Sequence, residues 1–235
     1  DEFHHSIERD IDSNIWVSSH IYPQTLPIEK IGRINRHEGG FIEDGIVKLS
    51  PDGEILLEKS VSQIFIDNGL EYLLFAHGNQ YEKDPTHIND IKPVDFDSDY
   101  WKKGDLFLSL RNQSMIILYR PSTNRIIWKG TGPFLHQHDV DILDQNRISV
   151  FNNRSLNVLP NKNIVDGHNE VIIYDFKKNQ YNSYLSKSLI AHDVRTKSQG
   201  RSRILPNGDL FFEETDYGRT LYFNKKFCSE SYSDR

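Results

Sequence analysis

The sequence of 235 residues has few features that would cross-link its fold or place it in a membrane. Its single cysteine, Cys228, excludes an internal disulfide and any cysteine-rich zinc site. No apolar run approaches the roughly 20 residues that a membrane-spanning helix needs, and no signal-peptide pattern is present. Because the first residue is Asp and not Met, we expect a fragment or a processed chain, in which missing targeting signals exclude little.

The sequence also has no excess of basic residues. Lys and Arg number 28 against 34 Asp and Glu, which gives a net charge of -6, and the two signs are interspersed. Proteins that bind nucleic acid or anionic membranes usually show a basic face. We therefore expect no nucleic-acid partner, while the 37% of hydrophobic residues are sufficient for a core.

The chain does contain many short β-prone runs separated by turn residues. In segment 45–61 a Ser-Pro-Asp-Gly turn separates two strands, because Pro51 presets φ and Gly53 supplies a positive φ. Similar hairpins are predicted over residues 7–19, 115–130, 170–186 and 201–215. The runs are rich in β-branched and aromatic residues and lack a sustained helical period, which predicts an all-β fold. Residues 62–77 are the best helix candidate.

A pattern that recurs at the strand starts makes the fold prediction more specific. HHSIERDIDSNIWV aligns without a gap on QHDVDILDQNRISV, and THINDIKPV fits the same frame before an insertion of nine residues. GRSRILPNGDLFFEE fits only its second half. Four-stranded units repeated in this way are typical of β-propeller blades. We predict about three and a half blades, at roughly 4–61, 87–131, 138–186 and, incomplete, 201–235.

Three histidines, His5, His87 and His138, occupy one position of this repeat, at the start of a strand. In a propeller the first strand of each blade lines the central channel, so equivalent residues converge. On the same frame Arg111 ends the next strand, in the place of Asn153. The residues alone leave three interpretations open: structural imidazoles that fix turns, a three-histidine metal site, and a catalytic constellation.

The segments FHHSIERDIDSNIWV, HINDIKPV…GDLFLSLRN and HQHDVDILDQNRISVFNN resemble the signatures of the bacterial arylsulfate sulfotransferases. The resemblance covers residues 3 to about 220. It implies a six-bladed β-propeller, of which this chain holds a part. It also implies transfer of a sulfuryl group from a phenolic sulfate ester to a phenol through a sulfated histidine, without a nucleotide donor, metal or cofactor.

The resemblance also assigns roles to residues. His138 matches the nucleophile, and His5 (or else His4), His87 and Arg111 match residues that bind the sulfuryl group. A neutral imidazole is a good nucleophile near its pKa of ~6.5, and a guanidinium presents a fork of donors to sulfonyl oxygens. The implied partners are a phenolic sulfate donor and a phenol acceptor, the implied location is the periplasm, and a homodimer is left open.

The sequence leaves two alternatives to this function open. The first is a non-catalytic propeller that binds a ligand or a partner and retains its histidines for structure. The second is a metal-dependent hydrolase or lyase on the same scaffold. Tyr100 and Trp101, in the insertion, either stack on an aromatic substrate or belong to the core or surface.

Overall fold

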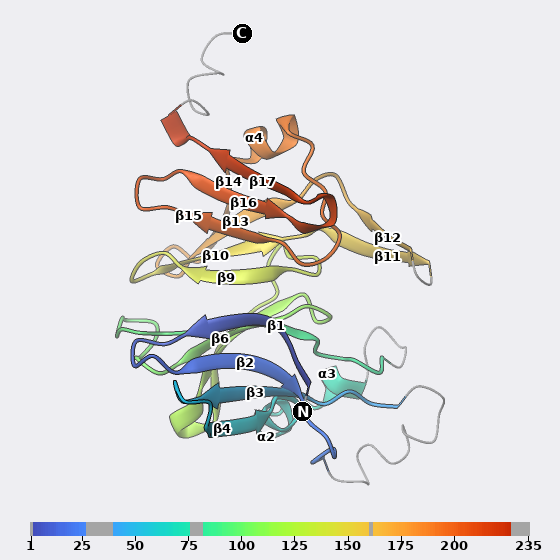
Figure 1. Cartoon of the computed structure of the whole chain (residues 1–235), viewed down its shortest axis with the longest axis vertical. Helices are drawn as coiled ribbons and strands as arrows, with labels where there is room; N and C mark the ends of the chain where they lie inside the picture. The colour runs from blue at the N-terminus through green and yellow to red at the C-terminus, as the bar shows by residue number, and fades with distance from the viewer. Residues whose placement is uncertain (1, 27–39, 76–81, 160–161, 227–235) are drawn as a thin grey trace. The chain divides into compact units, whose positions relative to one another are not determined.

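The computed structural model describes residues 2–26, 40–75, 82–159 and 162–226 (Figure 1). The chain divides into two compact units. The first comprises Asp1–Asp97 and Trp101–Thr131, and the second comprises Ser98–Tyr100 and Gly132–Arg235.

The first unit contains two four-stranded antiparallel sheets whose strands follow one another in chain order. The first sheet consists of β1 (Glu2–Arg9), β2 (Ile15–His20), β3 (Asp44–Leu49) and β4 (Ile55–Ser60). The second consists of β5 (Ile88–Pro93), β6 (Leu106–Leu110), β7 (Met115–Arg120) and β8 (Arg125–Gly130). In chain order, α2 (Val61–Asp67) and α3 (Tyr72–Phe75) come between the two sheets, and η2 (Pro121–Thr123) joins β7 to β8. The first strands of the two sheets, β1 and β5, lie side by side.

The second unit contains a four-stranded sheet, a three-stranded sheet and a hairpin. The four-stranded sheet consists of β9 (His138–Ile142), β10 (Arg147–Asn152), β13 (Glu170–Asp175) and β14 (Gln180–Tyr184). The hairpin, β11 (Ser155–Leu159) and β12 (Lys162–Val165), is inserted between β10 and β13. The three-stranded sheet consists of β15 (Arg201–Ile204), β16 (Leu210–Glu214) and β17 (Arg219–Phe223), with α4 (Ser186–Ala191) before it and η3 (Thr215–Tyr217) within it.

The main sheets run up and down, which is the strand order of a propeller blade. The predicted fold class, an all-β propeller chain of four-stranded blades, is confirmed. The five predicted hairpins are present, and the turn between β3 and β4 closes as expected, with Gly53 at a φ of 88° and its N–H donating to Ser50 O at 3.0 Å.

The helix predicted over residues 62–77 is divided into two short helices. Helix α2 ends where the Asn68 side chain donates to Ile64 O at 2.8 Å and Gly69 follows with a φ of 72°. A left-handed residue stops an α-helix. Helix α3 ends at Phe75, and residues 76–77 lie outside the described part of the chain.

Burial falls from the middle of each sheet to its last strand. All five residues of β6 are buried, whereas β8 and β4 alternate between more and less exposed positions. An outer strand with one solvated face alternates, and a strand covered on both faces does not. The buried side chains of β5, β6 and β7 pack with α2 and α3 into the core of the first unit.

Candidate active site

The first strands of three sheets, β1, β5 and β9, each contain a β-bulge near their start. In or beside these bulges His5, His87 and Asp139 adopt left-handed φ values of 63°, 46° and 48°. Bulges bend a strand and redirect its side chains. Positive φ values are unfavourable for residues other than glycine, so the surrounding structure must hold these positions in place.

The strand register confirms one equivalence of the repeat and corrects another. His5 and His138 each lie two residues before the residue that pairs with the matching valine of the next strand. In β5 the residue that pairs with the matching Leu108 is Ile91, four residues after His87. The alignment of His87 with His138 was therefore wrong by two residues. A slip of two keeps every side chain on the same face of a strand, so the apolar pattern could not reveal it.

His5 and His87 nevertheless meet in the first unit. Their Nε2 atoms are 3.1 Å apart, and their rings are edge to face with centroids 4.9 Å apart. Asp84 Oδ2 lies 2.5 Å from His87 Nδ1, and Asp84 Oδ1 accepts the backbone N–H of His87 at 3.2 Å. An ionised carboxylate only accepts hydrogen bonds, so Nδ1 of His87 carries a proton. The Nε2 atom of His87 is left to interact with His5.

Arg111 is tied to these residues through both its backbone and its side chain. Its N–H donates to His87 O at 3.1 Å. Its Nη1 donates to Asn112 Oδ1 at 2.7 Å, and Asn112 Nδ2 donates to Asp84 O at 2.7 Å. Burial lowers the pKa of Arg111, against the charges of Asp84 and Glu82, and a guanidinium keeps its charge. We call His5, Asp84, His87 and Arg111 the histidine cluster.

A second carboxylate, Asp44, fixes the start of β5 beside this cluster. It is fully buried, and its Oδ2 accepts from Thr86 Oγ1 at 2.5 Å and from Ile88 N at 2.9 Å. Burial and the charge of Asp84 raise the pKa of Asp44 to about 6. Burial also acts to raise the pKa of Asp84, but the hydrogen bonds from the ring and the backbone of His87 outweigh burial and lower it. Two neighbouring carboxyls with pKa values pushed apart are a common feature of active sites.

His138 is buried at the start of β9 in the second unit. Its Nδ1 lies 2.7 Å from Asn153 Oδ1, and Asn153 Nδ2 donates to Gln199 O at 2.9 Å. Because a carbonyl occupies the amide nitrogen, the amide oxygen must face His138, so Nδ1 carries the imidazole proton. The Nε2 atom then has a lone pair, which accepts from the backbone N–H of Gln199 at 3.3 Å.

A network of buried amides holds Asn153 in this orientation. Asn169 Nδ2 donates to Asn153 O at 2.7 Å and to Thr196 O at 2.8 Å, and Thr196 N donates back to Asn169 Oδ1 at 2.6 Å. Asn153, Asn169 and Thr196 are all fully buried. A buried network whose members are bonded in this way is rigid, so it fixes the tautomer of His138.

The structure gathers three of the four predicted site residues, His5, His87 and Arg111, in the first unit and places His138 in the second. The sequence prediction missed Asp84 and Asp44 as partners of the cluster. The only available signal for Asp84 was its place in DPTH, three residues before His87 in a turn-forming segment. No local pattern marks Asp44, because it reaches Thr86 across 42 residues of sequence.

Two acidic residues of the repeat, Glu8 and Asp139, bind residues of neighbouring strands. Glu8 Oε2 accepts from Lys92 Nζ at 2.9 Å, which joins β1 to β5. Asp139 Oδ2 accepts from the backbone N–H of Ser202 at 2.7 Å, which joins β9 to β15. The tautomer of His138 is set by an amide, that of Asn153.

The aromatic residues of the insertion pack against other rings. Trp101 is 1% exposed and lies edge to face with Phe107, with centroids 5.5 Å apart. Tyr100 lies against Phe176, with centroids 5.4 Å apart. Of the interpretations left open for Trp101, the structure supports the core.

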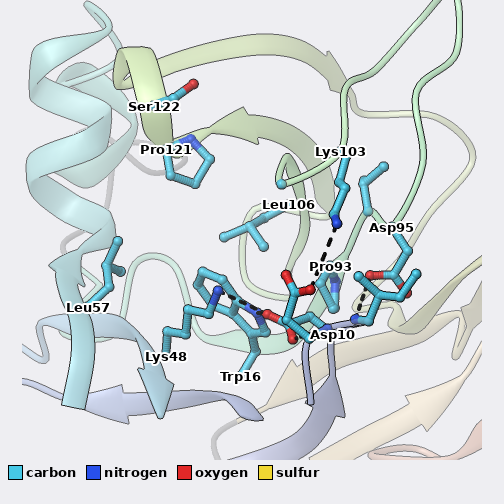
Figure 2. Close-up of a pocket in the computed structure, with 14 residues that line it drawn as sticks. Asp10, Trp16, Lys48, Leu57, Pro93, Asp95, Lys103, Leu106, Pro121 and Ser122 are labelled. Atoms are coloured by element: carbon cyan, nitrogen blue, oxygen red, sulfur yellow. Dashed lines mark hydrogen bonds and ion pairs between the residues drawn. The ribbon is translucent and has the colours of Figure 1, made fainter. Parts of the chain in front are cut away.

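A separate pocket of about 260 Å³ lies in the first unit beyond the ends of β1 and β5 (Figure 2). Lys48 Nζ lies 3.0 Å from Asp10 Oδ2 and 5.2 Å from the centroid of Trp16, and Trp16 Nε1 donates to Asp10 at 3.1 Å. Leu57 and Leu106 add apolar wall. The charged groups of this wall bind one another, and the pocket includes none of the predicted site residues.

Within residues 2–26, 40–75, 82–159 and 162–226, no three His, Cys, Asp or Glu side chains are grouped so that they could hold a metal ion. Among the helices of that same part of the chain, none is long and apolar enough to cross a membrane.

The sheets and their hydrogen-bonded histidines define a propeller-type protein with imidazoles fixed near the starts of the first strands of its sheets. Comparison with known families is specific: residues 2–226 match the family model of the arylsulfotransferases (ASST). The chain belongs to the arylsulfotransferase family. No curated protein matches it.

Among solved structures, the chain is similar to two lyases. Virginiamycin B lyase from Staphylococcus aureus is 9% identical with a TM-score of 0.42, and the match covers 93% of this chain and 54% of that one. A streptogramin B lyase is 12% identical with a TM-score of 0.41, and the match covers 94% of this chain and 54% of that one. The chain thus spans about half the length of each lyase.

Proposed function

We propose that this chain acts in an aryl-sulfate sulfotransferase that moves a sulfuryl group from a phenolic sulfate ester to a phenol through a sulfated His138. Membership of the arylsulfotransferase family over residues 2–226 implies aryl sulfate and phenol substrates. The observation that carries the choice of His138 is its bond to Asn153 Oδ1, which puts the imidazole proton on Nδ1 and a lone pair on Nε2. Export to the periplasm is part of the same proposal.

In the first step the Nε2 lone pair of His138 attacks sulfur, an N–S bond forms, and the bond from sulfur to the aryl oxygen breaks. The electron pair leaves with the phenolate. In the second step the oxygen of the acceptor phenol attacks sulfur and Nε2 regains its lone pair. The acceptor's proton ends on the phenolate released in the first step, so the sum is an exchange of sulfuryl group and proton between two phenols.

Asn153 contributes to this reaction by holding the Nδ1 proton. Attack through Nε2 places positive charge on the imidazole, and the Asn153 carbonyl dipole, 2.7 Å from Nδ1, stabilises that charge. The bond from Gln199 N–H to Nε2 is 3.3 Å long and therefore weak, so exchanging it for a bond to sulfur costs little.

The proposal keeps His5, His87 and Arg111 as residues that bind the sulfuryl group. The guanidinium of Arg111 retains charge and offers several donors to sulfonyl oxygens. The imidazoles of His5 and His87 share a hydrogen bond, so each has a defined donor or acceptor role. Loss of one donor that faces charge in a transition state typically costs about 3 kcal/mol, or more than a hundredfold in rate.

The test is to incubate wild-type protein with p-nitrophenyl sulfate and to record intact and peptide mass spectra. We expect a sulfuryl adduct on the peptide that contains His138, together with release of p-nitrophenolate. His138→Ala should lose both, and His138→Gln, which keeps more of the buried volume, should lose both while retaining the thermal unfolding transition. The matched control is His136→Ala, in a neighbouring histidine, which should keep the adduct.

Two results would contradict the proposal. Folded wild-type protein that forms no adduct and releases no phenolate from several phenolic esters would favour a non-catalytic propeller that binds a ligand or partner. Turnover that is abolished by a chelator and restored by a metal ion, with no adduct on any histidine, would favour the metal-dependent hydrolase or lyase.

A further inference from the structure

Asp84 holds His87 at two points. One carboxylate oxygen bonds the imidazole Nδ1 at 2.5 Å, and the other bonds the backbone N–H at 3.2 Å. His87 has a φ of 46°, a conformation that a residue with a Cβ adopts only when its surroundings impose it. The two bonds to Asp84 therefore fix both the backbone and the ring of His87.

Asp84 is itself held by the end of β6. Its backbone carbonyl accepts from Asn112 Nδ2 at 2.7 Å, and Asn112 Oδ1 accepts from Arg111 Nη1 at 2.7 Å. The backbone N–H of Arg111 returns to His87 O at 3.1 Å. These bonds close a ring of contacts that includes Asp84, His87, Arg111 and Asn112. A side chain supported in this way keeps its orientation when a ligand binds.

The start of β5 after His87 is held by Asp44. This buried carboxylate accepts from Thr86 and from the backbone of Ile88, which flank His87 on both sides. Among the described residues, further titratable groups near the cluster include His20, whose Nε2 lies 3.8 Å from Asp44, and Glu82, whose charge acts on Arg111. Among the carboxylates of this region, the one that accepts a hydrogen bond from Nδ1 of the His87 ring is Asp84.

We propose that Asp84 is a positioning residue: it keeps the proton of neutral His87 on Nδ1, so that the Nε2 lone pair accepts a hydrogen bond from Nε2–H of His5. A carboxylate that bonds one imidazole nitrogen sets which nitrogen is free for the next partner. Asp84 thereby sets the direction of the 3.1 Å bond between the two histidines, and with it the nitrogen that His5 presents elsewhere. The inference rests on the proposed function of the cluster in binding the sulfuryl group.

The direct test is the tautomer of His87, read from long-range ¹⁵N–¹H spectra of protein labelled at histidine. Wild type should show Nδ1 protonated and Nε2 as an acceptor. In Asp84→Asn the amide NH₂ can donate to Nδ1 while the amide oxygen keeps the backbone bond, so the proton should move to Nε2. Asp84→Glu, which restores a carboxylate, should return the proton to Nδ1.

The matched control is Glu82→Gln. It removes a nearby carboxylate charge but no bond to the His87 ring, and its amide oxygen can still accept from the Asp84 N–H that Glu82 binds at 3.2 Å. It should leave the tautomer of His87 unchanged. A wild-type His87 protonated only on Nε2, or an Asp84→Asn spectrum identical to wild type, would overturn the inference.

Kinetics separate this inference from the proposed function. If the cluster binds the sulfate ester, Asp84→Asn should raise KM for p-nitrophenyl sulfate by roughly tenfold or more, the effect of one hydrogen bond to a charged group, with a smaller change in kcat. Wild-type protein that forms no sulfuryl adduct, but whose His87 changes tautomer as expected, would refute the proposed function and uphold the positioning role. Adduct formation in wild-type protein, together with an unchanged His87 tautomer in Asp84→Asn, would uphold the proposed function and refute the positioning role.

Discussion

At the scale of single residues, the chemistry of His138 depends on one amide, that of Asn153. We predict that Asn153→Ala lowers the free energy of unfolding by about 2 kcal/mol or more, because it leaves the His138 Nδ1–H and the Gln199 carbonyl without their buried partner. It should also let His138 populate the tautomer with a proton on Nε2, which cannot attack sulfur. Chemical denaturation and ¹⁵N spectra of labelled histidine measure the two effects.

Asn157→Ala is the matched control for this prediction. Asn157 is exposed on the hairpin strand β11, so its loss should change stability by less than about 0.5 kcal/mol and leave the His138 spectrum unchanged. An Asn153→Ala protein as stable as this control, with Nδ1 of His138 still protonated, would show that the amide network does not set the tautomer.

Each site histidine depends on a hydrogen-bond partner, and this explains which parts of the site the sequence could predict. His5, His87, His138 and Arg111 were identified as candidates because their types and neighbours form a recognisable pattern. Asp84 and Asn153 were not assigned roles as partners, because neither a turn residue three positions from His87 nor an amide 15 positions from His138 leaves a periodic signal in one sequence. Even so, DPTH places Asp84 in a turn-forming segment that ends at His87.

At the scale of elements, the residue before β15 is a glycine that the site requires. Gly200 has a φ of 93°, and a Cβ there would lie 2.5 Å from Cζ of the buried ring of Phe151. Its neighbour Gln199 bonds His138. We predict that Gly200→Ala destabilises the protein by about 3 kcal/mol, from the left-handed backbone and from overpacking, and weakens the contact between Gln199 and His138. Thermal unfolding and the ¹⁵N shift of His138 Nε2 test both effects.

Gly218→Ala provides the comparison, since Gly218 also has a positive φ, of 61°, but a Cβ there would have no neighbouring atom within 4 Å. It should cost only about 1 kcal/mol, the price of the left-handed backbone. Equal losses of stability in the two variants would mean that the Phe151 ring moves to make room for the added methyl group. Contact with this ring would then not be the reason for a glycine before β15.

The same scale shows the limit of prediction from pattern. Strands, hairpins and blades follow from alternation and turn chemistry, so the sequence predicts them well. The register of β5 does not follow from alternation, because a shift of two residues preserves the alternating pattern. The bulge that sets this register depends on bonds from Asp44 to Thr86 and Ile88, which join elements far apart in the sequence.

At the scale of the whole molecule, stability depends on pH through carboxyl groups with pKa shifts of opposite sign. Burial opposes ionisation of Asp10, Asp84 and Asp144, but hydrogen bonds outweigh it and lower their pKa values. Their contribution is present above the ordinary carboxyl pKa and is lost as the pH falls through their lowered values. Asp44 is the opposite case, since burial and the charge of Asp84 raise its pKa from 3.8 to about 6.

The folded protein therefore binds the Asp44 proton more tightly than the unfolded chain does. Stability from this group is fully present below pH 3.8 and is lost as the pH rises through about 6. The loss amounts to roughly 3 kcal/mol, since each pKa unit corresponds to about 1.4 kcal/mol. Asp44→Asn cannot ionise, and its amide oxygen can still accept from Thr86 and Ile88. We predict that the variant is close to wild type in stability near pH 4 and more stable by roughly 3 kcal/mol at pH 7.

Urea unfolding of both proteins between pH 4 and pH 7 measures this difference. Asp52→Asn, in the exposed turn between β3 and β4, removes the same charge from the surface and should differ from wild type by less than about 0.5 kcal/mol throughout. If Asp44→Asn is less stable than wild type at pH 7, the ionised carboxylate is a net stabilising group in the fold. The start of β5, and with it His87, would then depend on a charged Asp44 rather than tolerate one.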